Sequence, residues 1–280
     1  MIITEFYRGQ GFGNQLWLYA VVNSASRKLS CDFSIISYHR FKGKNFLNLD
    51  PGQRLISKSS NHPNPNRPRN IQNYITDENL TLQNYSNYIK VYSKIDGSFQ
   101  MEELIQEDRD YYKTMFKVCQ KINIDLANVC IINLRGGEYS GVPELLLPRE
   151  YYVKAMELMK KHNPNFEFKI ITDDPRLAKS YFPELEVLSK PPRSIAAIQS
   201  RFPSSPKIQF DFSILQNAGG LILSNSSFSW WGAWTNCVAT QIIAPKFWGN
   251  YNNPKLGWGP RGIFTSGWSF LDSTGKISVK

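Results

Sequence analysis

Three apolar runs in the sequence are each followed by polar residues of a kind that binds anions. The segments that follow them are RGGEYSG from Arg135, DDP from Asp173 and NSSFSWWGAW from Asn225. The guanidinium fork of Arg135 fits two phosphate oxygens at once. Ser226 and Ser227 stand where a helix should begin, and the N–H groups and hydroxyls of a helix start form an anion site. A serine there is also a preferred N-cap without any ligand, and that simpler interpretation stays open.

Asp211 is a carboxylate on an apolar helix face. In the helix predicted for residues 206–218, its neighbours one turn away include Ile208, Ile214 and Leu215. An isolated buried charge is costly, so this carboxylate requires a partner. The sequence leaves two partners open. One is the backbone N–H groups of a neighbouring loop, and the other is a ligand with two adjacent donors, such as the N1–H and N2 amine edge of guanine.

A glycine-containing loop, RGQGFGNQ, follows the first apolar run of the chain. Gly9, Gly11 and Asn14 come close to the dinucleotide fingerprint G-x-G-x-x-G. A tight turn that needs a positive φ explains the glycines without a ligand. An NAD-binding interpretation also stays open, because Asp32 lies near the next strand, where such sites place an acidic residue.

Strand and helix patterns alternate along most of the chain, as in a parallel α/β sheet. Strands are predicted for residues 2–6, 31–36, 129–134, 166–172, 186–188, 221–224 and 238–244. Helices are predicted for residues 15–29, 101–122, 148–161, 175–182, 206–218 and 228–236. Residues 39–75, rich in Asn, Pro, Lys and Arg, are predicted to form an exposed loop, with residues 61–70 its least structured part. Ligands of such sheets bind outside the carboxyl ends of the strands, which is where the polar segments lie.

The composition describes a globular chain long enough for two domains. It has 280 residues, of which 41% are hydrophobic. The start lacks a signal-peptide pattern, and no apolar run approaches the roughly 18 residues of a membrane span, so a cytoplasmic protein is expected. Four scattered cysteines show neither metal-binding nor disulfide spacing.

The basic residues concentrate in one segment. Residues 27–69 contain nine Lys or Arg against Asp32 and Asp50, which is +7 of the net charge of +10. Such a segment either attracts an anionic partner or is a solvated loop. Peripheral contact with an anionic membrane through residues 27–69 stays open. A non-catalytic nucleic-acid-binding protein is the other alternative, but no helix-turn-helix, zinc-finger or RNP motif is present, so no nucleic acid is expected.

Three motifs together resemble the bacterial α-1,2-fucosyltransferases of glycosyltransferase family 11. They are GFGNQLWLYA from Gly11, NLRGGEY from Asn133 in place of an HxRRGDY segment, and SNSSFSWWGAW from Ser224. The resemblance implies a GT-B architecture, with two Rossmann-like domains facing a cleft. Residues 1–125 would form an acceptor-side domain carrying the glycine loop, and residues 126–280 a domain that binds the GDP-sugar. It also implies inverting transfer of L-fucose from GDP-fucose to a galactose-type hydroxyl of a surface glycan precursor, without a metal or other cofactor.

The resemblance carries roles onto individual residues. Arg135 would bind the β-phosphate, Ser226 and Ser227 would contact phosphate, and Asp211 would read guanine. The other residues implied to lie at the donor are Gly11, Gly13, Asn14, Asn133, Asn225 and Phe228. Glu138 is expected either to deprotonate the acceptor hydroxyl or to brace its own loop. Asp173 and Asp174 match an acidic pair of the relatives, and Asp174 before Pro175 also suits a helix N-cap.

The chain departs from the family motif at two positions that bear on the donor. Asn133 replaces a histidine and Gly136 replaces a second arginine, which removes a titratable group and a cation from the donor site. The glycine is expected to loosen the loop. GDP binding is expected to remain, while another GDP-sugar or another acceptor linkage is the alternative to fucose in α-1,2 linkage.

Overall fold

The computed structural model describes residues 1–54, 71–76, 89–118, 124–189, 206–260 and 263–279. The chain divides into two compact units, Met1–Met115 and Phe116–Lys280. The division falls after residue 115 instead of after the predicted residue 125, because Phe116 and Val118 pack on residues of the second unit. The ring of Phe116 meets Trp231 edge to face at 5.1 Å between centroids, and the Val118 N–H donates to Gln216. The acceptor-side and donor-side roles of the two domains stay predictions.

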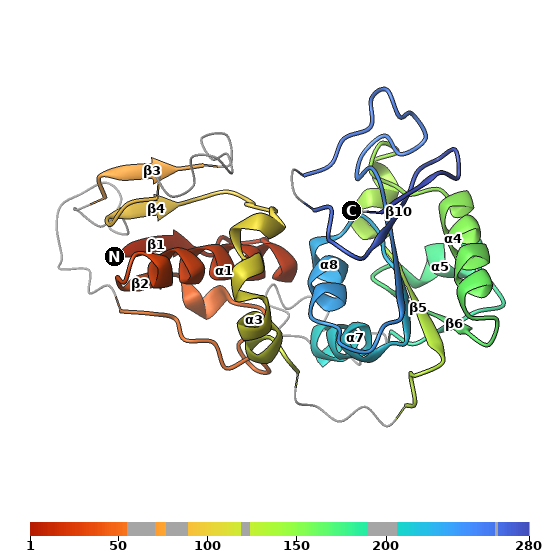
Figure 1. Cartoon of the computed structure of the whole chain (residues 1–280), viewed down its shortest axis with the longest axis horizontal. Coiled ribbons are helices and arrows are strands. Elements are labelled where there is room, and N and C mark those ends of the chain that lie inside the picture. Colours follow the sequence, from red (N-terminus) through yellow and green to blue (C-terminus); the bar gives the residue numbers. More distant parts are fainter. Residues whose placement is uncertain (55–70, 77–88, 119–123, 190–205, 261–262, 280) are drawn as a thin grey trace. The chain divides into compact units, whose positions relative to one another are not determined.

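The first unit contains a four-stranded parallel sheet in the order β2-β1-β4-β3 (Figure 1). Its strands are β1 (Ile2–Glu5), β2 (Phe33–Ile36), β3 (Asn73–Ile75) and β4 (Ser93–Ile95). The connection from β1 to β2 is the long helix α1 (Phe12–Lys28), which is buried along most of its length. The prediction of a loop over residues 39–75 is wrong at its end, where β3 lies; residues 61–70 lie outside the described residues.

The prediction of a continuous helix over residues 101–122 is wrong. Two 3-10 turns, Glu102–Leu104 and Gln106–Asp108, precede the short helix α3 (Arg109–Met115). The break between them falls at Ile105, whose φ of −131° and ψ of −5° depart from helical geometry. Leu104 and Ile105 are both buried. Consecutive buried apolar side chains suit an irregular segment that follows the core better than one face of a helix.

The second unit contains a seven-stranded sheet in the order β11-β10-β9-β8-β5-β6-β7, parallel except for the terminal β11. Its strands are β5 (Val129–Leu134), β6 (Glu167–Thr172), β7 (Glu186–Val187), β8 (Gly220–Ile222), β9 (Gln241–Pro245), β10 (Ser269–Leu271) and β11 (Ile277–Val279). Its helices are α4 (Arg149–His162), α5 (Pro175–Tyr181), α7 (Pro206–Asn217) and α8 (Ser227–Trp234). β5 matches its predicted bounds, and every residue of β5 is buried.

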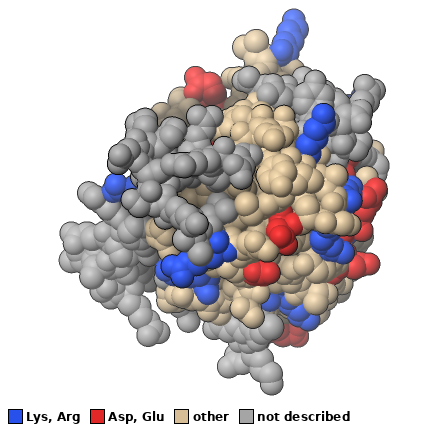
Figure 2. Space-filling model, turned by 90° about the vertical axis from the view of Figure 1, so that its left-hand side faces the viewer, with Lys and Arg blue, Asp and Glu red and all other residues tan. Residues whose placement is uncertain are grey.

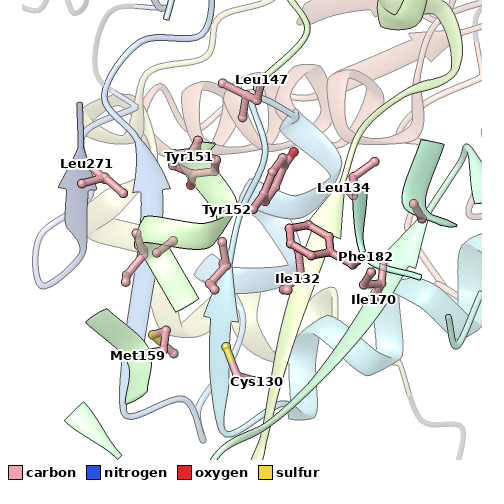
Figure 3. Close-up of a cluster of buried hydrophobic side chains, with 14 of the residues drawn as sticks. Cys130, Ile132, Leu134, Leu147, Tyr151, Tyr152, Met159, Ile170, Phe182 and Leu271 are labelled. Carbon is pink, nitrogen blue, oxygen red and sulfur yellow. The ribbon is translucent and has the colours of Figure 1, made fainter. Parts of the chain in front are cut away.

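The core of the second unit forms where α4 covers the sheet (Figure 3). The buried residues of α4 are Tyr151, Tyr152, Ala155 and Met159, spaced at the three- to four-residue period of a helix face. They pack on alternate residues of β5, such as Ile132, and on neighbouring strands. Both units are therefore α/β structures built on parallel strands, which confirms the predicted class with two Rossmann-like domains.

The basic segment over residues 27–69 is partly neutralised in the structure. Arg27 pairs with Asp108 at 3.2 Å, and Lys28 pairs with Glu107 at 2.8 Å. Figure 2 shows one face of the molecule, on which Lys and Arg side chains are interspersed with Asp and Glu. No helix in the described part of the chain combines the length and apolar character needed to cross a membrane. Membrane contact through this segment stays a prediction.

Candidate functional site

The polar segments of the second unit meet at one edge of its sheet. Strands β8, β5, β6 and β7 are consecutive neighbours and run parallel, so their carboxyl ends lie together. Arg135 follows β5, Asp173 follows β6 and Asn225 follows β8. The structure thus brings the three segments singled out by sequence to the edge where α/β proteins bind their ligands.

Arg135 is fixed by a carboxylate and an aromatic ring. Its Nη1 donates to Asp173 Oδ2, and its guanidinium carbon lies 5.0 Å from the ring centroid of Tyr139. The other oxygen of Asp173 accepts the Gly136 N–H at 2.9 Å. Asp173 therefore holds both the arginine and its loop, a role that the sequence did not reveal. The guanidinium stays partly exposed and presents a fixed cation at the strand end.

The expectation that Gly136 loosens the loop stays a prediction, while the structure gives a steric reason for the glycine. Its φ is −112°, so the backbone makes no use of the left-handed region. A Cβ at this position would lie 2.5 Å from the Cβ of Asp174 and 2.8 Å from Leu177. Gly137 does have a positive φ of 46°, and a Cβ there would lie 2.5 Å from Asp173 Oδ2. The glycines thus let the loop lie tightly against the acidic pair, and a second arginine side chain has no room at position 136.

Asp174 is the N-cap of α5, with Pro175 in the first turn, as the sequence predicts. Its carboxylate accepts the Leu177 N–H at 3.1 Å and the Ser140 hydroxyl at 3.1 Å. The hydrogen bond from Leu177 is the main reason that the pKa of Asp174 is lowered from its ordinary value. The second member of the acidic pair therefore has a structural role.

Asp211 is buried, with 6% of its surface exposed. Its Oδ2 accepts the Ser189 hydroxyl at 2.9 Å, and the Ser189 oxygen in turn accepts the Thr172 N–H at 2.9 Å. Its Oδ1 is buried without a hydrogen-bond partner among the described residues. Burial raises the pKa of Asp211 to about 7, although the charge of Lys207 opposes the rise. One carboxylate oxygen thus remains for a donor that the described residues do not supply.

Ser189 was missed by the sequence analysis, although a signal was present. It directly follows the strand predicted for residues 186–188, so it occupies a strand exit like the segments that were inspected. A single serine at the end of a short strand is common, which is why it carried no weight.

Ser226 is the N-cap of α8, but its hydroxyl makes no capping hydrogen bond. The structure therefore does not support the interpretation that the Ser226 side chain caps the helix. Asn225 ties the loop in place, because its Nδ2 donates to the carbonyls of Leu145 and Trp248, each at 2.6 Å. Asn133 is buried and accepts the Ser224 hydroxyl at 2.6 Å. Asn133 and Asn225 thus stabilise the strand ends from which α8 starts.

Ser227, Phe228 and Glu138 complete the sequence-predicted residues of the second unit. Ser227 opens α8, and the ring of Phe228 lies 5.7 Å from that of Phe212 on α7. Glu138 is 92% exposed at its side chain, with its carboxylate 3.9 Å from Arg135. Its catalytic role stays a prediction.

The glycine loop lies in the first unit and differs from its prediction in one respect. The helix α1 begins at Phe12, so Gly13 and Asn14 belong to its first turn and not to the loop. Gly9 has a φ of 84°, as the tight-turn interpretation requires. Gly11 is the N-cap with a φ of −68°, and a Cβ there would meet nothing within 4 Å. Asn14 accepts a hydrogen bond from Gln100 at 3.0 Å. The described residues thus explain Gly9 but give no reason for Gly11.

The described ranges contain no candidate metal site. No group of three or more His, Cys, Asp or Glu side chains there is placed to hold a metal ion. The metal-free chemistry implied by the family resemblance stays a prediction.

Two glycosyltransferases of Escherichia coli are similar to this chain in sequence. Alpha-1,2-colitosyltransferase is 25% identical over 269 residues, which cover 85% of this chain and 89% of the relative. The O-antigen biosynthesis glycosyltransferase WbnK is 25% identical over 177 residues, which cover 55% of each chain. No family model matches the chain. These similarities support the predicted class, a glycosyltransferase, at the level of sugar transfer.

Solved structures of glycosyltransferases align with most of the chain at low scores. The crystal structure of NodZ alpha-1,6-fucosyltransferase soaked with GDP-fucose has a TM-score of 0.47 and 13% identity, covering 88% of this chain and 94% of that one. The heptosyltransferase WaaC of E. coli with ADP has a TM-score of 0.39 and 10% identity, covering 92% and 91%. Scores this low carry no argument about function, so the fold rests on the sheet topology of the chain itself.

Proposed function

We propose that this protein is an inverting glycosyltransferase that moves L-fucose from GDP-fucose to a galactose-type hydroxyl of a surface glycan precursor, in α-1,2 linkage. The observation that carries the proposal is the group formed by Arg135, its partner Asp173 and Asp211 at one edge of the second sheet. This group offers a fixed cation for a diphosphate and a buried carboxylate oxygen for a base edge. The start of α8 adds backbone N–H groups and two serine hydroxyls for phosphate oxygens.

The chemistry of transfer assigns each of these groups a task. The bond between the sugar C1 and the diphosphate oxygen breaks with its electrons going to GDP. The acceptor oxygen bonds to C1 from the opposite face and gives its proton to a general base or to water. Negative charge therefore collects on the departing diphosphate. Arg135 and the first turn of α8 stabilise that charge by electrostatics prearranged before the reaction. Asp173 keeps the guanidinium oriented, so little reorganisation accompanies the charge transfer.

Asp211 is the residue proposed to select guanine. The N1–H and N2 amine of guanine are two adjacent donors, and an ionised carboxylate accepts both. Ser189 already donates to one oxygen, while the other has no partner among the described residues. Adenine and uracil present a different order of donors and acceptors, so either base would place an acceptor against this carboxylate. A buried mismatch of this kind costs about 1–3 kcal/mol.

Colitose is a second candidate for the transferred sugar. One relative with similarity over most of the chain is named a colitosyltransferase. Colitose differs from L-fucose only in lacking the 3-hydroxyl. The family that this chain resembles has an arginine at the position of Gly136. In this chain, the neighbouring residues leave no space for a side chain there. A donor site with fewer hydrogen-bonding groups suits a sugar with fewer hydroxyls.

Nucleotide-dependent thermal stabilisation tests the proposal. The full chain is melted with GDP, ADP, UDP and NAD, each with and without EDTA, because a ligand that binds the folded state raises the melting temperature by mass action. GDP is expected to stabilise most, with EDTA leaving the shift in place. Equal stabilisation by NAD, or a strict need for Mg²⁺ or Mn²⁺, contradicts the proposal. Transfer from GDP-fucose and GDP-colitose to a galactoside then separates the two sugars.

A further inference from the structure

A group of polar and aromatic residues lies at the sheet of the first unit. We call it the tyrosine–aspartate cluster, and its members are Glu5, Tyr7, Tyr74, Lys94 and Asp96. They come from β1, β4 and β3, which are neighbours in the parallel sheet. Tyr7 and Asp96 follow the carboxyl ends of their strands, the edge where sheets of this class bind ligands.

Asp96 is the centre of the cluster. Its Oδ2 accepts the hydroxyl of Tyr7 at 2.6 Å and also the hydroxyl of Tyr74. The ammonium of Lys94 lies 3.7 Å from the same oxygen. Among the described residues, none donates a hydrogen bond to the other oxygen, Oδ1. Both phenols and the cation thus converge on one side of the carboxylate and leave its second oxygen for another donor.

Lys94 connects the cluster to β1 and fixes both rings. Its Nζ pairs with Glu5 at 3.1 Å and donates to the Tyr7 oxygen at 3.1 Å. The same ammonium lies 5.6 Å from the ring centroid of Tyr7 and 5.7 Å from that of Tyr74. Burial, together with Asp96, raises the pKa of Tyr74 to about 12, so its phenol stays a hydrogen-bond donor at neutral pH.

The hydroxyls of both tyrosines are fixed by hydrogen bonds, and yet both residues stay exposed. Tyr7 is 37% exposed and Tyr74 is 50% exposed. A tyrosine whose hydroxyl is already anchored offers aromatic contact area at low cost in conformational entropy. Beside these rings stands an open carboxylate oxygen. Aromatic surface with a few directional polar groups is the composition of a small-molecule site.

The charge of the cluster narrows the class of ligand. Two carboxylates and one ammonium give it a net negative charge, which disfavours a nucleotide diphosphate or a lipid phosphate. A neutral pyranose matches all of the features. Its C–H face packs on an aromatic ring, and its hydroxyls donate to a carboxylate oxygen.

We propose that the tyrosine–aspartate cluster binds a hexopyranose unit of the acceptor glycan, with Tyr7 and Tyr74 contacting its C–H face and Asp96 Oδ1 accepting its hydroxyls. This inference rests on the proposed function, since it names where the acceptor of that reaction is held. It assigns the acceptor to the first unit on the chemistry of that unit's own residues.

Saccharide binding to the full chain without any nucleotide tests the inference. The probes are methyl β-galactoside, lactose and methyl β-glucoside, followed by saturation-transfer NMR and titration. Wild type is expected to bind at least one of them. Tyr74→Ala removes the ring and is expected to weaken binding at least tenfold, while Tyr74→Phe retains the ring and loses less. Asp96→Asn replaces an acceptor with a donor and is expected to weaken binding as well.

A matched control and a separate readout keep the outcomes distinct. Tyr92→Ala changes a tyrosine of the same unit that is 45% exposed but precedes the amino end of β4, and it is expected to leave binding unchanged. Stabilisation by GDP is measured on every variant as a test of folding and of the donor site. If GDP stabilises wild type but no probe binds, or if Tyr74→Ala and Asp96→Asn bind as wild type does, the inference is overturned and the proposed function stands. If GDP does not stabilise wild type, the proposed function is overturned. Saccharide binding is measured independently and still tests the cluster.

Discussion

Arg135 shows how one side chain depends on a neighbour that only the fold reveals. The sequence marks it as a phosphate-binding fork, but the fork is oriented by Asp173, which is 38 positions away in the chain. A guanidinium held in this way loses less freedom when it binds two phosphate oxygens than a mobile one does.

Arg135→Lys is therefore expected to lower turnover by at least tenfold, about 1.4 kcal/mol in the barrier, because the charge remains and the bidentate fork is lost. Sugar transfer and circular dichroism are measured on the variant. Arg149→Lys is the matched control, since Arg149 lies on α4 and donates to the carbonyl of Tyr181. Turnover equal to wild type in Arg135→Lys would show that the arginine only stabilises its loop.

Asp211 combines a stability effect with a binding effect. Its folded-state pKa of about 7 lies above the ordinary 3.8, so the folded chain binds this proton more tightly than the unfolded chain. The free energy of unfolding should fall as pH rises from about 4 to about 7 and then level off, by an amount on the order of 4 kcal/mol. Urea unfolding of wild type and Asp211→Asn across this range measures it. The variant is expected to lack this contribution. If the free energy of unfolding changes with pH in the same way in both proteins, Asp211 does not make this contribution.

The same ionisation should control the donor. If the ionised carboxylate accepts the guanine donors, GDP-fucose affinity should rise about tenfold from pH 6 to pH 8, as Asp211 loses its proton. GDP-fucose is the suitable ligand because its diphosphate diester does not titrate in this interval. Asp211→Asn should show a flat profile and a reduced preference for GDP over UDP. A variant that keeps the wild-type preference would remove Asp211 from base recognition.

At the scale of elements, helices and strands with long regular apolar patterns were predicted correctly, whereas several short strands were missed. β5, β6, α4 and α7 lie within one or two residues of their predicted bounds, because each has a sustained apolar pattern and a recognisable end. Strands β3, β4, β10 and β11 have three residues each and were missed. Three residues contain too little alternation to be separated from a loop unless, as at β8, they lie in an apolar run, and only pairing with their neighbours makes these four segments strands.

That limit also explains which site residues were found. Arg135, Asp173 and Ser226 follow strands that the sequence predicted, and they were expected at the same edge of the sheet. The tyrosine–aspartate cluster was missed because two of its members, Tyr74 and Asp96, belong to or follow the short strands β3 and β4. The register that brings them together is set by tertiary pairing.

Asp174 allows a test of one element end. Asp174→Ala removes the N-cap of α5 and is expected to lower the free energy of unfolding by about 1 kcal/mol. Asp174→Asn is the matched control, because asparagine caps a helix about as well while removing the charge. Urea unfolding measures both variants. An equal loss in the two would assign the effect to the charge and not to the cap.

At the scale of the whole molecule, the two units carry different chemistry. The second holds the fixed cation, the buried carboxylate and the start of α8, whereas the first holds the glycine loop and the tyrosine–aspartate cluster. Each unit has its own parallel sheet, so each has its own set of strand ends. The proposed reaction between two substrates suits such a chain, since its donor and its acceptor would be recognised by different kinds of groups.

Hydrogen exchange of the full chain tests this division. GDP-fucose is expected to slow amide exchange at residues 133–138 and in the first turn of α8, because phosphate oxygens that accept from first-turn N–H groups hold those amides closed. The first turn of α4 is the control, since no donor residue lies there.

Exchange at residues 11–14 decides whether the glycine loop takes part in binding the donor. The described residues give Gly11 no steric reason to be glycine, and close approach of a ligand to the backbone would supply one, so slower exchange is expected there too. If exchange at residues 11–14 is unchanged while the first turn of α8 is protected, the glycine loop has no part in binding the donor, and the turn at Gly9 is its explanation.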